Sequence, residues 1–479
     1  MISVNDAGRS AAFGELSEFR EEFYRSLCRR ADALFELSDA VLCTDGPVLS
    51  LVGLSLAAQH RRGHGALYDA VNNGVVEVDR LRRAVIGLPL PRDRDGRIVL
   101  TVDVSAWLRP DAATAADRSF CHVYGRGKNA AQIIPGWAYS FVAALETGRS
   151  SWTAVLDVVR IGPLADATTV TAGQVREVID RLREHGRWCD GDPRVLIVFD
   201  AGYDVTRLAW LLRDLPVDLV GRLRSDRVLY LAAQAPVPGR VGRPVRHGEV
   251  LDLDAPAGHP DPAVTTVSET SRYGAAFADA WDRAHPRLAR RSGWAQHTGP
   301  LPIIEGTLIR LRVDRLPGDR NPKPVWLWAS ATGLTSTTVD RIWQAYLRRF
   351  DVEHTFRMFK QTLGWTRPRL QDPKAADRWT WLIIAVHTQL RLARDLAADL
   401  RRPWERPPAK PGRLSPARVR RGFRNLHPKL TQPAGAPKPT RPGPGRPPGS
   451  RNKHVRPHPP VGKTQHQNTT TRHNTQQKV

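Results

Sequence analysis

The sequence predicts an α/β protein: a mixed sheet that follows an all-helical region, contains a β-rich insertion and is followed by a basic, disordered tail. Three observations support this fold class. Apolar residues recur at helical spacing in about the first ninety residues, strand-like and helix-like apolar patterns alternate from residue 97 to residue 231, and the composition changes sharply after residue 400. The chain has 479 residues, which is long enough for two or three domains.

The first region is predicted to be helical over residues 15–92, after a flexible end at residues 1–14. The apolar residues of its first helix recur at helical spacing: Leu16, Phe19, Phe23 and Leu27. Further helical segments at residues 49–59 and 76–86 lie on either side of a basic, glycine-containing turn at residues 60–64. This arrangement is typical of a helix-turn-helix DNA reader and equally of an ordinary helical bundle, so both interpretations stay open.

The central region, residues 97–231, is predicted to form the mixed sheet. Its elements follow in the order of three strands, a helix, a strand, a helix and a strand, at residues 98–104, 137–145, 152–161, 172–185, 195–199, 205–215 and 217–223. The strand at residues 195–199 is apolar without alternation, which is typical of a strand buried on both faces. This order of elements matches the ribonuclease H-like fold, in which helices cover both sides of a mixed sheet.

The remaining chain divides into three parts. Residues 232–324 are rich in Pro and Gly and contain short strand-like segments, which indicates a β-rich insertion. Residues 325–400 return to the core, with a single long helix expected at residues 338–363. Residues 401–479 hold 19 Lys and Arg residues against one acid, Glu405, and few large apolar residues, so this tail is predicted to be disordered.

The charge of the chain indicates a polyanionic partner. The formal net charge is +24, and most of the excess lies in the tail, while the body is only mildly basic. Nucleic acid fits this distribution better than a membrane surface, and a tail that only aids solubility is the simpler alternative. The four cysteines form no Cys-x-x-Cys pair, which argues against a zinc finger or a redox motif. Neither a signal peptide nor a membrane-spanning run is expected, so a cytoplasmic, nucleoid-associated protein is predicted.

Two aspartates on apolar strands are candidate catalytic residues. Asp103 lies within the strand at residues 98–104, and Asp200 follows the strand at residues 195–199. A carboxylate in such a place is costly unless something compensates it, and a divalent metal held by oxygen ligands is the usual compensation. A single Asp at a strand end is more often a cap or turn residue. The pair becomes informative because a third carboxylate, Glu353, follows on a predicted helix.

Glu353 belongs to a regular spacing, Tyr-x2-Arg-x3-Glu-x6-Lys, formed by Tyr346, Arg349, Glu353 and Lys360. With about 3.6 residues per turn, these four side chains are expected on one face of a single helix. A carboxylate, two cations and a phenol on one face suit a surface that holds a metal ion and a phosphodiester beside it. Without the two aspartates, a solvated helix face would be the simpler interpretation.

Together, Asp103, Asp200 and the Tyr-Arg-Glu-Lys signature resemble the bacterial insertion-sequence DDE transposases of the Tyr-Arg-Glu-Lys class, over about residues 20 to 400. The resemblance implies that Asp103, Asp200 and Glu353 bind two Mg²⁺ or Mn²⁺ ions. One metal would activate water to nick the transposon end, and the freed 3′-hydroxyl would attack a second phosphodiester.

The resemblance also assigns roles to the other members of the signature. Arg349 and Lys360 would hold phosphates near the scissile bond, the arginine by a bidentate fork and the lysine as a point charge. Tyr346 would pack against the DNA strand or hydrogen-bond to it. The helical region at residues 15–92 would bind the transposon ends, and at least a homodimer would assemble on double-stranded DNA from the ends and the target.

Weaker DNA-contact candidates lie in two basic segments. Arg126 and Lys128 belong to a glycine-containing basic loop without the spacing of a nucleotide-binding P-loop. Arg446 belongs to a Gly-Arg-Pro sequence that partly matches the AT-hook, an extended segment that enters the minor groove. Two alternatives to a transposase remain: a ribonuclease H-like nuclease that cuts without strand transfer, and a non-catalytic DNA-binding derivative of a transposase.

Overall fold

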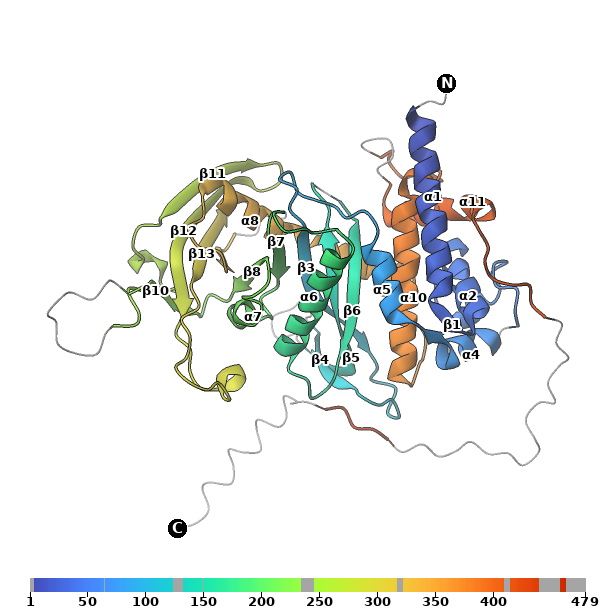
Figure 1. Ribbon diagram of the computed structural model, residues 1–479, viewed down its shortest axis with the longest axis horizontal. Helices are drawn as coiled ribbons and strands as arrows, with labels where there is room; N and C mark the ends of the chain where they lie inside the picture. Colours follow the sequence, from blue (N-terminus) through green and yellow to red (C-terminus); the bar gives the residue numbers. More distant parts are fainter. Residues whose placement is uncertain are drawn as a thin grey trace, which may run out of the picture.

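The computed structural model describes residues 4–63, 65–123, 132–148, 150–233, 245–316, 322–408, 414–438 and 457–461. These residues form a mixed α/β structure around one large mixed sheet. Figure 1 shows a group of helices at one end, the central strands in the middle and the strands of the insertion at the other end. No helix in these ranges is both long enough and apolar enough to cross a membrane.

The central sheet places its strands in the order β6-β5-β3-β7-β8. The strands are β3 (Val99–Leu108), β5 (Gln132–Leu145), β6 (Thr153–Ile161), β7 (Val195–Phe199) and β8 (Val217–Leu223). β3, β7 and β8 run parallel, while β5 runs antiparallel to both β3 and β6. The predicted strands and helices of this region are confirmed to within a few residues. An additional edge strand, β4 (Ser119–Val123), pairs with β5 and was not predicted.

Helices cover both faces of this sheet. α6 (Ala167–Glu184) packs against β6, and α7 (Val205–Leu211) packs against β8. α8 (Ser336–Arg348) lies on the opposite face, against β7 and β8 (Figure 1). The two faces are distinguished at Gly221 of β8, where a side chain would collide with Val205 of α7. Residues next to Gly221 in β8 therefore point toward α8.

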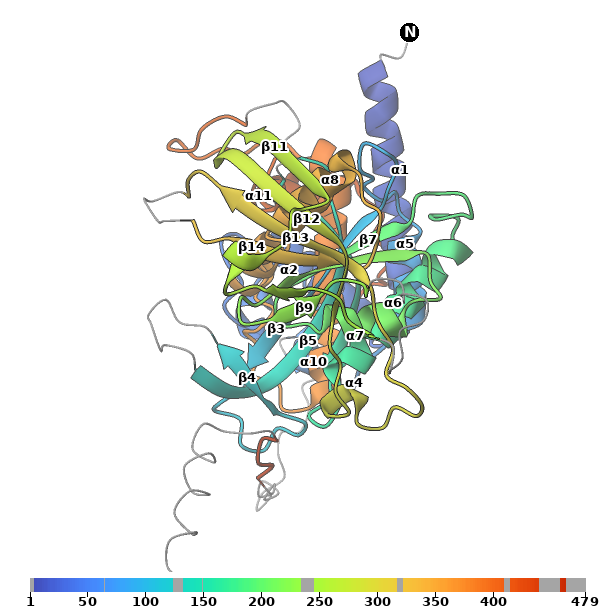
Figure 2. The same ribbon diagram turned by 90° about the vertical axis from the view of Figure 1, so that its left-hand side faces the viewer.

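The β-rich nature predicted for the insertion is confirmed, but the insertion is not a separate sheet. Its strands are β9 (Val228–Tyr230), β10 (Val250–Asp252), β11 (Val264–Thr270), β12 (Gly274–Pro286) and β13 (Gly306–Val313). β13 pairs with β14 (Val325–Ala329), and β14 pairs antiparallel with β8. The strands of the insertion therefore continue the central sheet, and α8 also packs against β11 and β12 (Figure 2).

The prediction of a single helix at residues 338–363 is wrong. α8 ends at Arg348, α9 (Asp351–Arg357) begins after a tight turn, and a π-helical segment follows at Met358–Thr362. Within the turn the backbone bonds join residues three apart: the N–H groups of Arg349, Val352 and Glu353 donate to the carbonyls of Tyr346, Arg349 and Phe350. These tighter bonds break the regular 3.6-residue repeat, so the four signature residues do not share one straight helix face.

The helical region combines elements from both ends of the chain. Its helices are α1 (Val4–Arg25), α2 (Ala31–Cys43), the short α3 (Leu51–Leu54), α4 (Gly65–Asn73), α5 (Val78–Ile86) and α10 (Pro373–Leu392). A two-stranded sheet joins β1 (Leu27–Arg29) to β2 (Val75–Val76). The first helix starts at Val4 rather than near residue 15. α10 packs against α1, α2 and α4, so it belongs to this group of helices as well as covering β6.

The prediction of a disordered tail is wrong for residues 414–438. α11 (Pro416–Leu426) packs against α2 and α10 and buries Val419, Phe423 and Leu426, which recur at helical spacing. Arg420 is also buried, and it donates hydrogen bonds to the carbonyls of Val41 and Gly46. The abundance of Pro and Arg hid this short apolar stripe in the sequence. The tail residues 439–456 and 462–479 lie outside the described residues.

Arg61 and Arg62 of the predicted basic turn form ion pairs, although the Arg61 side chain is 42% exposed. The Arg61 and Arg62 guanidinium groups pair with Glu36 and Asp32 at 2.8 and 3.0 Å, and both donate to the carbonyl of Gly435. α4 packs against α2 and α10, whereas α5 packs against α1 and β6. The segment predicted as the helix before the turn, residues 49–59, contains only the four-residue α3, so the geometry favours the helical bundle over a helix-turn-helix.

Candidate active site

The register of the parallel strands brings the two aspartates side by side. Thr101 of β3 lies opposite Val198 of β7, and Val102 lies opposite Phe199. The next pair along the strands is Asp103 and Asp200, at the point where β7 ends. Asp200 lies two residues after Val198, which is buried in the apolar cluster beneath α8, and Asp103 lies two residues after Thr101, the partner of Val198. By the alternation of strand side chains, both carboxylates are therefore presented to the α8 side of the sheet.

Arg349 bridges the two aspartates. Its guanidinium Nη1 lies 3.4 Å from Oδ2 of Asp103, and Nη2 lies 3.3 Å from Oδ1 of Asp200. The Arg349 side chain is 5% exposed, against 17% for Asp103 and 41% for Asp200. The guanidinium also lies 4.7 Å from the ring centre of Phe350. The tight turn between α8 and α9 thus directs a buried cation onto the paired carboxylates.

The environment of Asp103 disfavours its negative charge. The pKa of this carboxyl is raised to about 6, chiefly by burial; the charges of Asp200 and Glu353 contribute to the rise, while Arg349 and the N–H of Val104 oppose it. A cation bound beside such a carboxylate stabilises its negative charge. The three acids named by the sequence therefore act on one another electrostatically.

Glu353 stands at the edge of this arrangement. It lies in the first turn of α9 and is exposed to solvent. In the part of the chain that the structure describes, no group of three or more His, Cys, Asp and Glu side chains is close enough to hold a metal ion. The space between the two aspartates is instead taken by Arg349.

Tyr346 and Lys360 lie beside the aspartates. Tyr346 is 2% exposed on α8, and burial raises the pKa of its hydroxyl, with a further contribution from Asp200. Burial lowers the pKa of Lys360, an effect that Cys121 and Asp103 oppose. The Lys360 ammonium lies 5.7 Å from the ring centre of Trp365. The structure therefore brings both residues to the site, although they come from different helical segments.

Comparison with known protein families agrees with this geometry. Residues 22–287, more than half of the chain, match the family described as DDE superfamily endonuclease. The chain belongs to this family. Its members act on DNA and use divalent metals, which places the chain among the DDE nucleases and transposases. The match includes Asp103 and Asp200 and ends before Glu353. No curated protein matches the sequence.

The residues present fit a divalent metal by their chemistry. Asp103, Asp200 and Glu353 offer only oxygen ligands, which Mg²⁺ and Mn²⁺ prefer. The half-buried Asp103 carboxyl lies near two other acids, and a bound cation would stabilise its negative charge. Metal binding in this arrangement requires Arg349 to give up its contacts with the two aspartates.

Arg222 is a site residue that the sequence did not reveal. Val198 and Phe199 of β7 lie opposite Val220 and Gly221 of β8, so Arg222 is the next residue beside Asp200. Its charge lowers the pKa of Tyr346. The signal that could have found it is its position at the carboxyl end of a predicted strand, at the same sheet edge as Asp200.

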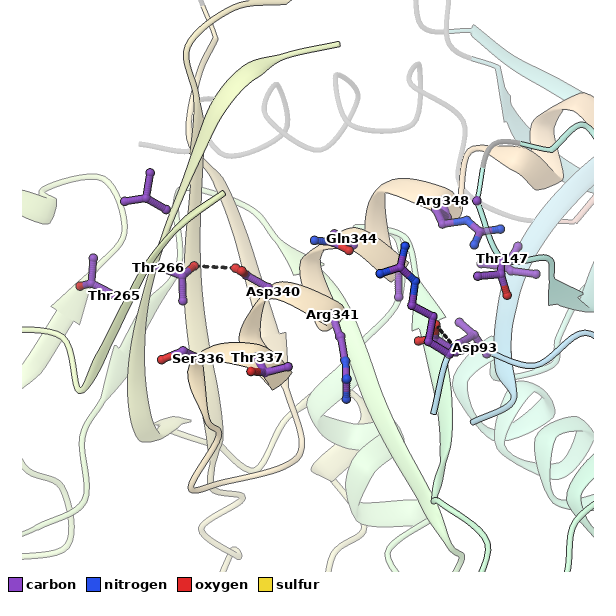
Figure 3. A pocket seen from close by; sticks show the side chains of 16 residues that line it. Asp93, Thr147, Thr265, Thr266, Ser336, Thr337, Asp340, Arg341, Gln344 and Arg348 are labelled. Carbon is purple, nitrogen blue, oxygen red and sulfur yellow. Dashed lines mark hydrogen bonds between the residues drawn. The ribbon is translucent and has the colours of Figure 1, made fainter. Parts of the chain in front are cut away.

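Two clefts lie along α8, and neither is lined by the three carboxylates. One, of about 660 Å³, runs between α8, β11 and the segment at Asp93, and Figure 3 shows Thr266 of β11 pointing to Asp340 of α8 across it. A second, of about 940 Å³, lies between the β11–β12 hairpin and the turn at Phe350. The chemistry is therefore expected at the open sheet edge rather than in an enclosed pocket.

Three predicted DNA contacts fall outside the described residues. Arg126 and Lys128 lie in the segment 124–131, and Arg446 lies in the segment 439–456. Their contacts with DNA stay predictions.

Proposed function

We propose that this chain is a transposase of the Tyr-Arg-Glu-Lys class that binds the ends of its own insertion sequence, nicks them by metal-dependent hydrolysis and joins the 3′-hydroxyl to target DNA. The observation that carries the proposal is the contact of Arg349 with both Asp103 and Asp200. Asp103 and Asp200, predicted from their places on two apolar strands, and Arg349, predicted from the spacing of the signature, are in contact. The strand order β6-β5-β3-β7-β8 supports a ribonuclease H-like core for this chemistry.

The acids are the candidate metal ligands. Asp103 and Asp200, with Glu353, would hold two Mg²⁺ or Mn²⁺ ions. When bound, such ions supply an activated water and stabilise the leaving oxygen of an in-line displacement. The position of Asp103 and Asp200 on adjacent strands fixes their separation, because the strands are joined by backbone hydrogen bonds.

The cations are the candidate phosphate contacts. Arg349 already presents two guanidinium nitrogens to two carboxylate oxygens, and the same fork can hold two oxygens of a phosphodiester. Lys360 is a half-buried cation on the Asp103 side of the site. Partial desolvation strengthens the attraction of such a cation for a phosphate.

The other parts of the chain are assigned by the same proposal. The helical region would bind the transposon ends, the basic tail would add non-specific attraction to DNA, and a homodimer would hold two ends together. Arg61 and Arg62 form ion pairs with Glu36 and Asp32, which makes their guanidinium groups less available for base contacts. Another surface of the helical region would have to supply base contacts.

The test uses the full chain and labelled duplexes that carry the DNA flanking its coding sequence. Nicking at the element boundary with Mg²⁺, absent with EDTA and absent in Asp103→Ala, is expected. A pre-cut end with a free 3′-hydroxyl should be joined to target DNA. Cutting without joining would replace the transposase with a nuclease. Binding without cutting would point to a non-catalytic derivative.

A further inference from the structure

Arg222 extends the row of charged residues at the active-site edge of the sheet. The registers of β3, β7 and β8 place Asp103, Asp200 and Arg222 at successive positions across three parallel strands. Neighbouring strands lie about 4.8 Å apart, so Arg222 begins one strand beyond Asp200. Across the three strands, the row therefore consists of two acids followed by one base.

The side chain of Arg222 points to the α8 side of the sheet. Gly221 faces Val205 of α7, so its neighbour in β8 faces the other way. On the next strand, Arg222 lies opposite Leu327 of β14, which is buried in the apolar cluster beneath α8. Arg222 is therefore on the same face as the signature residues of α8. Its electrostatic effect on the Tyr346 hydroxyl agrees with this placement.

The guanidinium of Arg222 is available to an anion from outside the protein. Among the described residues, no carboxylate lies within ion-pair distance of its guanidinium, although Asp200 follows the neighbouring strand. Asp200 pairs with Arg349 instead, and nearby surface arginines are paired in the usual way, such as Arg194 with Asp218 and Arg224 with Asp226. An exposed cation beside a row of acids, without an acid of its own, is suited to an anion brought by the substrate.

We propose that Arg222 binds a backbone phosphate of the DNA strand next to the phosphate that is cut, on the β8 side of Asp200. The proposal rests on the proposed function, because it takes the substrate to be DNA lying across this sheet edge. By holding this phosphate, Arg222 sets the position of the DNA strand along the sheet edge. It thereby keeps the scissile phosphate next to Asp103 and Asp200. The contact is with the backbone and carries no base preference.

The test compares Arg222→Gln and Arg222→Lys with a matched control, Arg213→Gln. Arg213 is an exposed arginine after α7, on the opposite face of the sheet, where it stacks on Trp210. Affinity for a duplex carrying the element end is measured over a series of salt concentrations, in Ca²⁺ so that DNA is not cut. The slope of log affinity against log salt counts the phosphates that are neutralised.

Arg222→Gln is expected to weaken binding by about tenfold and to reduce the salt slope by about one, while Arg222→Lys restores the slope and Arg213→Gln leaves it unchanged. A slope for Arg222→Gln equal to that of the control overturns the proposal. Equal thermal unfolding midpoints for the three variants and the wild type exclude misfolding. A wild-type chain that binds the duplex with the expected slope but never cuts it in Mg²⁺ would remove the proposed function and leave the Arg222 contact standing. A chain that does not bind DNA at all removes both.

Discussion

Replacing Arg349 by methionine should tighten the binding of divalent metal to the protein without DNA. Arg349 contacts Asp103 and Asp200 at 3.4 and 3.3 Å, and a metal ion needs the same carboxylate oxygens. Methionine fills a similar volume and removes the charge, so the ion no longer competes with a guanidinium. Arg349 is 5% exposed, and its neighbours Phe350 and Tyr346 can pack against a thioether.

The size of the effect follows from the geometry of the two ion pairs. Both distances are longer than the roughly 2.7–2.9 Å of a strong charge-assisted hydrogen bond, and Asp200 is 41% exposed. Each pair is therefore assigned about 1 kcal/mol, the upper end for exposed pairs. Loss of both corresponds to about 2 kcal/mol, or roughly a 30-fold lower dissociation constant for the metal.

The assay is a titration of free Mn²⁺, followed by its electron paramagnetic resonance signal, at about pH 8, where the Asp103 carboxyl with its pKa of about 6 is ionised in the wild type. Wild type, Arg349→Met and the ligand control Asp103→Asn are compared. The same dissociation constant for wild type and Arg349→Met, or weaker binding by the variant, would refute competition between the guanidinium and the metal. No binding in any of the proteins would refute the metal site itself.

The same contacts predict coupling between DNA and metal. If a DNA phosphate draws the Arg349 fork away from the aspartates, a duplex end should tighten Mn²⁺ binding to the wild type. It should have little such effect on Arg349→Met, whose aspartates are already free of the guanidinium. The Mn²⁺ titration repeated with and without duplex measures this difference.

Four further outcomes are expected. Glu353→Ala should abolish metal-dependent cleavage while end binding, measured by gel shift, stays within about twofold, because Glu353 is exposed and its substitution should leave the fold intact. Metal affinity without DNA should fall as the pH drops through about 6, since the raised pKa of Asp103 means that protons compete with metal below that value; a flat Mn²⁺ titration between pH 5 and pH 8 would count against it. Phe423→Ala should lower the free energy of unfolding by about 3–5 kcal/mol, seen as a lower thermal midpoint. Asp157→Asn should cost about 3–5 kcal/mol in chemical denaturation, because the fully buried Asp157 pairs with Arg82 of α5 and Arg181 of α6.

The strands that carry the two aspartates could be predicted because each is a short apolar run whose burial does not depend on a particular partner. Val195–Phe199 is fully buried, as expected for a strand covered on both faces. The pairing of Asp103 with Asp200 then follows from the register of two parallel strands. Spacing also identified Arg349, although the reason it offered, a shared helix face, proved wrong.

Other features depend on partners that lie far away in the sequence. Arg61 and Arg62 read as a basic surface because their acids, Glu36 and Asp32, and the carbonyl of Gly435 are remote along the chain. The position of α11 depends on its packing against α2 and α10, of which α2 lies far away in the sequence. The proximity of Arg222 to Asp200 becomes apparent only when the register of β7 and β8 is known.

The insertion acts as a scaffold for the active-site helix. Asp340 in the first half of α8 accepts hydrogen bonds from Thr266 and Ser268 of β11, at 2.6 Å each, and Figure 3 shows the contact with Thr266. The second half of α8 ends at the turn that places Arg349 over Asp103 and Asp200. Because β14 joins the insertion to β8 by continuous backbone pairing, both ends of α8 rest on one sheet. The strands between Asp200 and Glu353 therefore support α8, which leads into the turn that carries Arg349. Insertions or deletions in β11 should therefore disturb the contacts of Arg349 with Asp103 and Asp200.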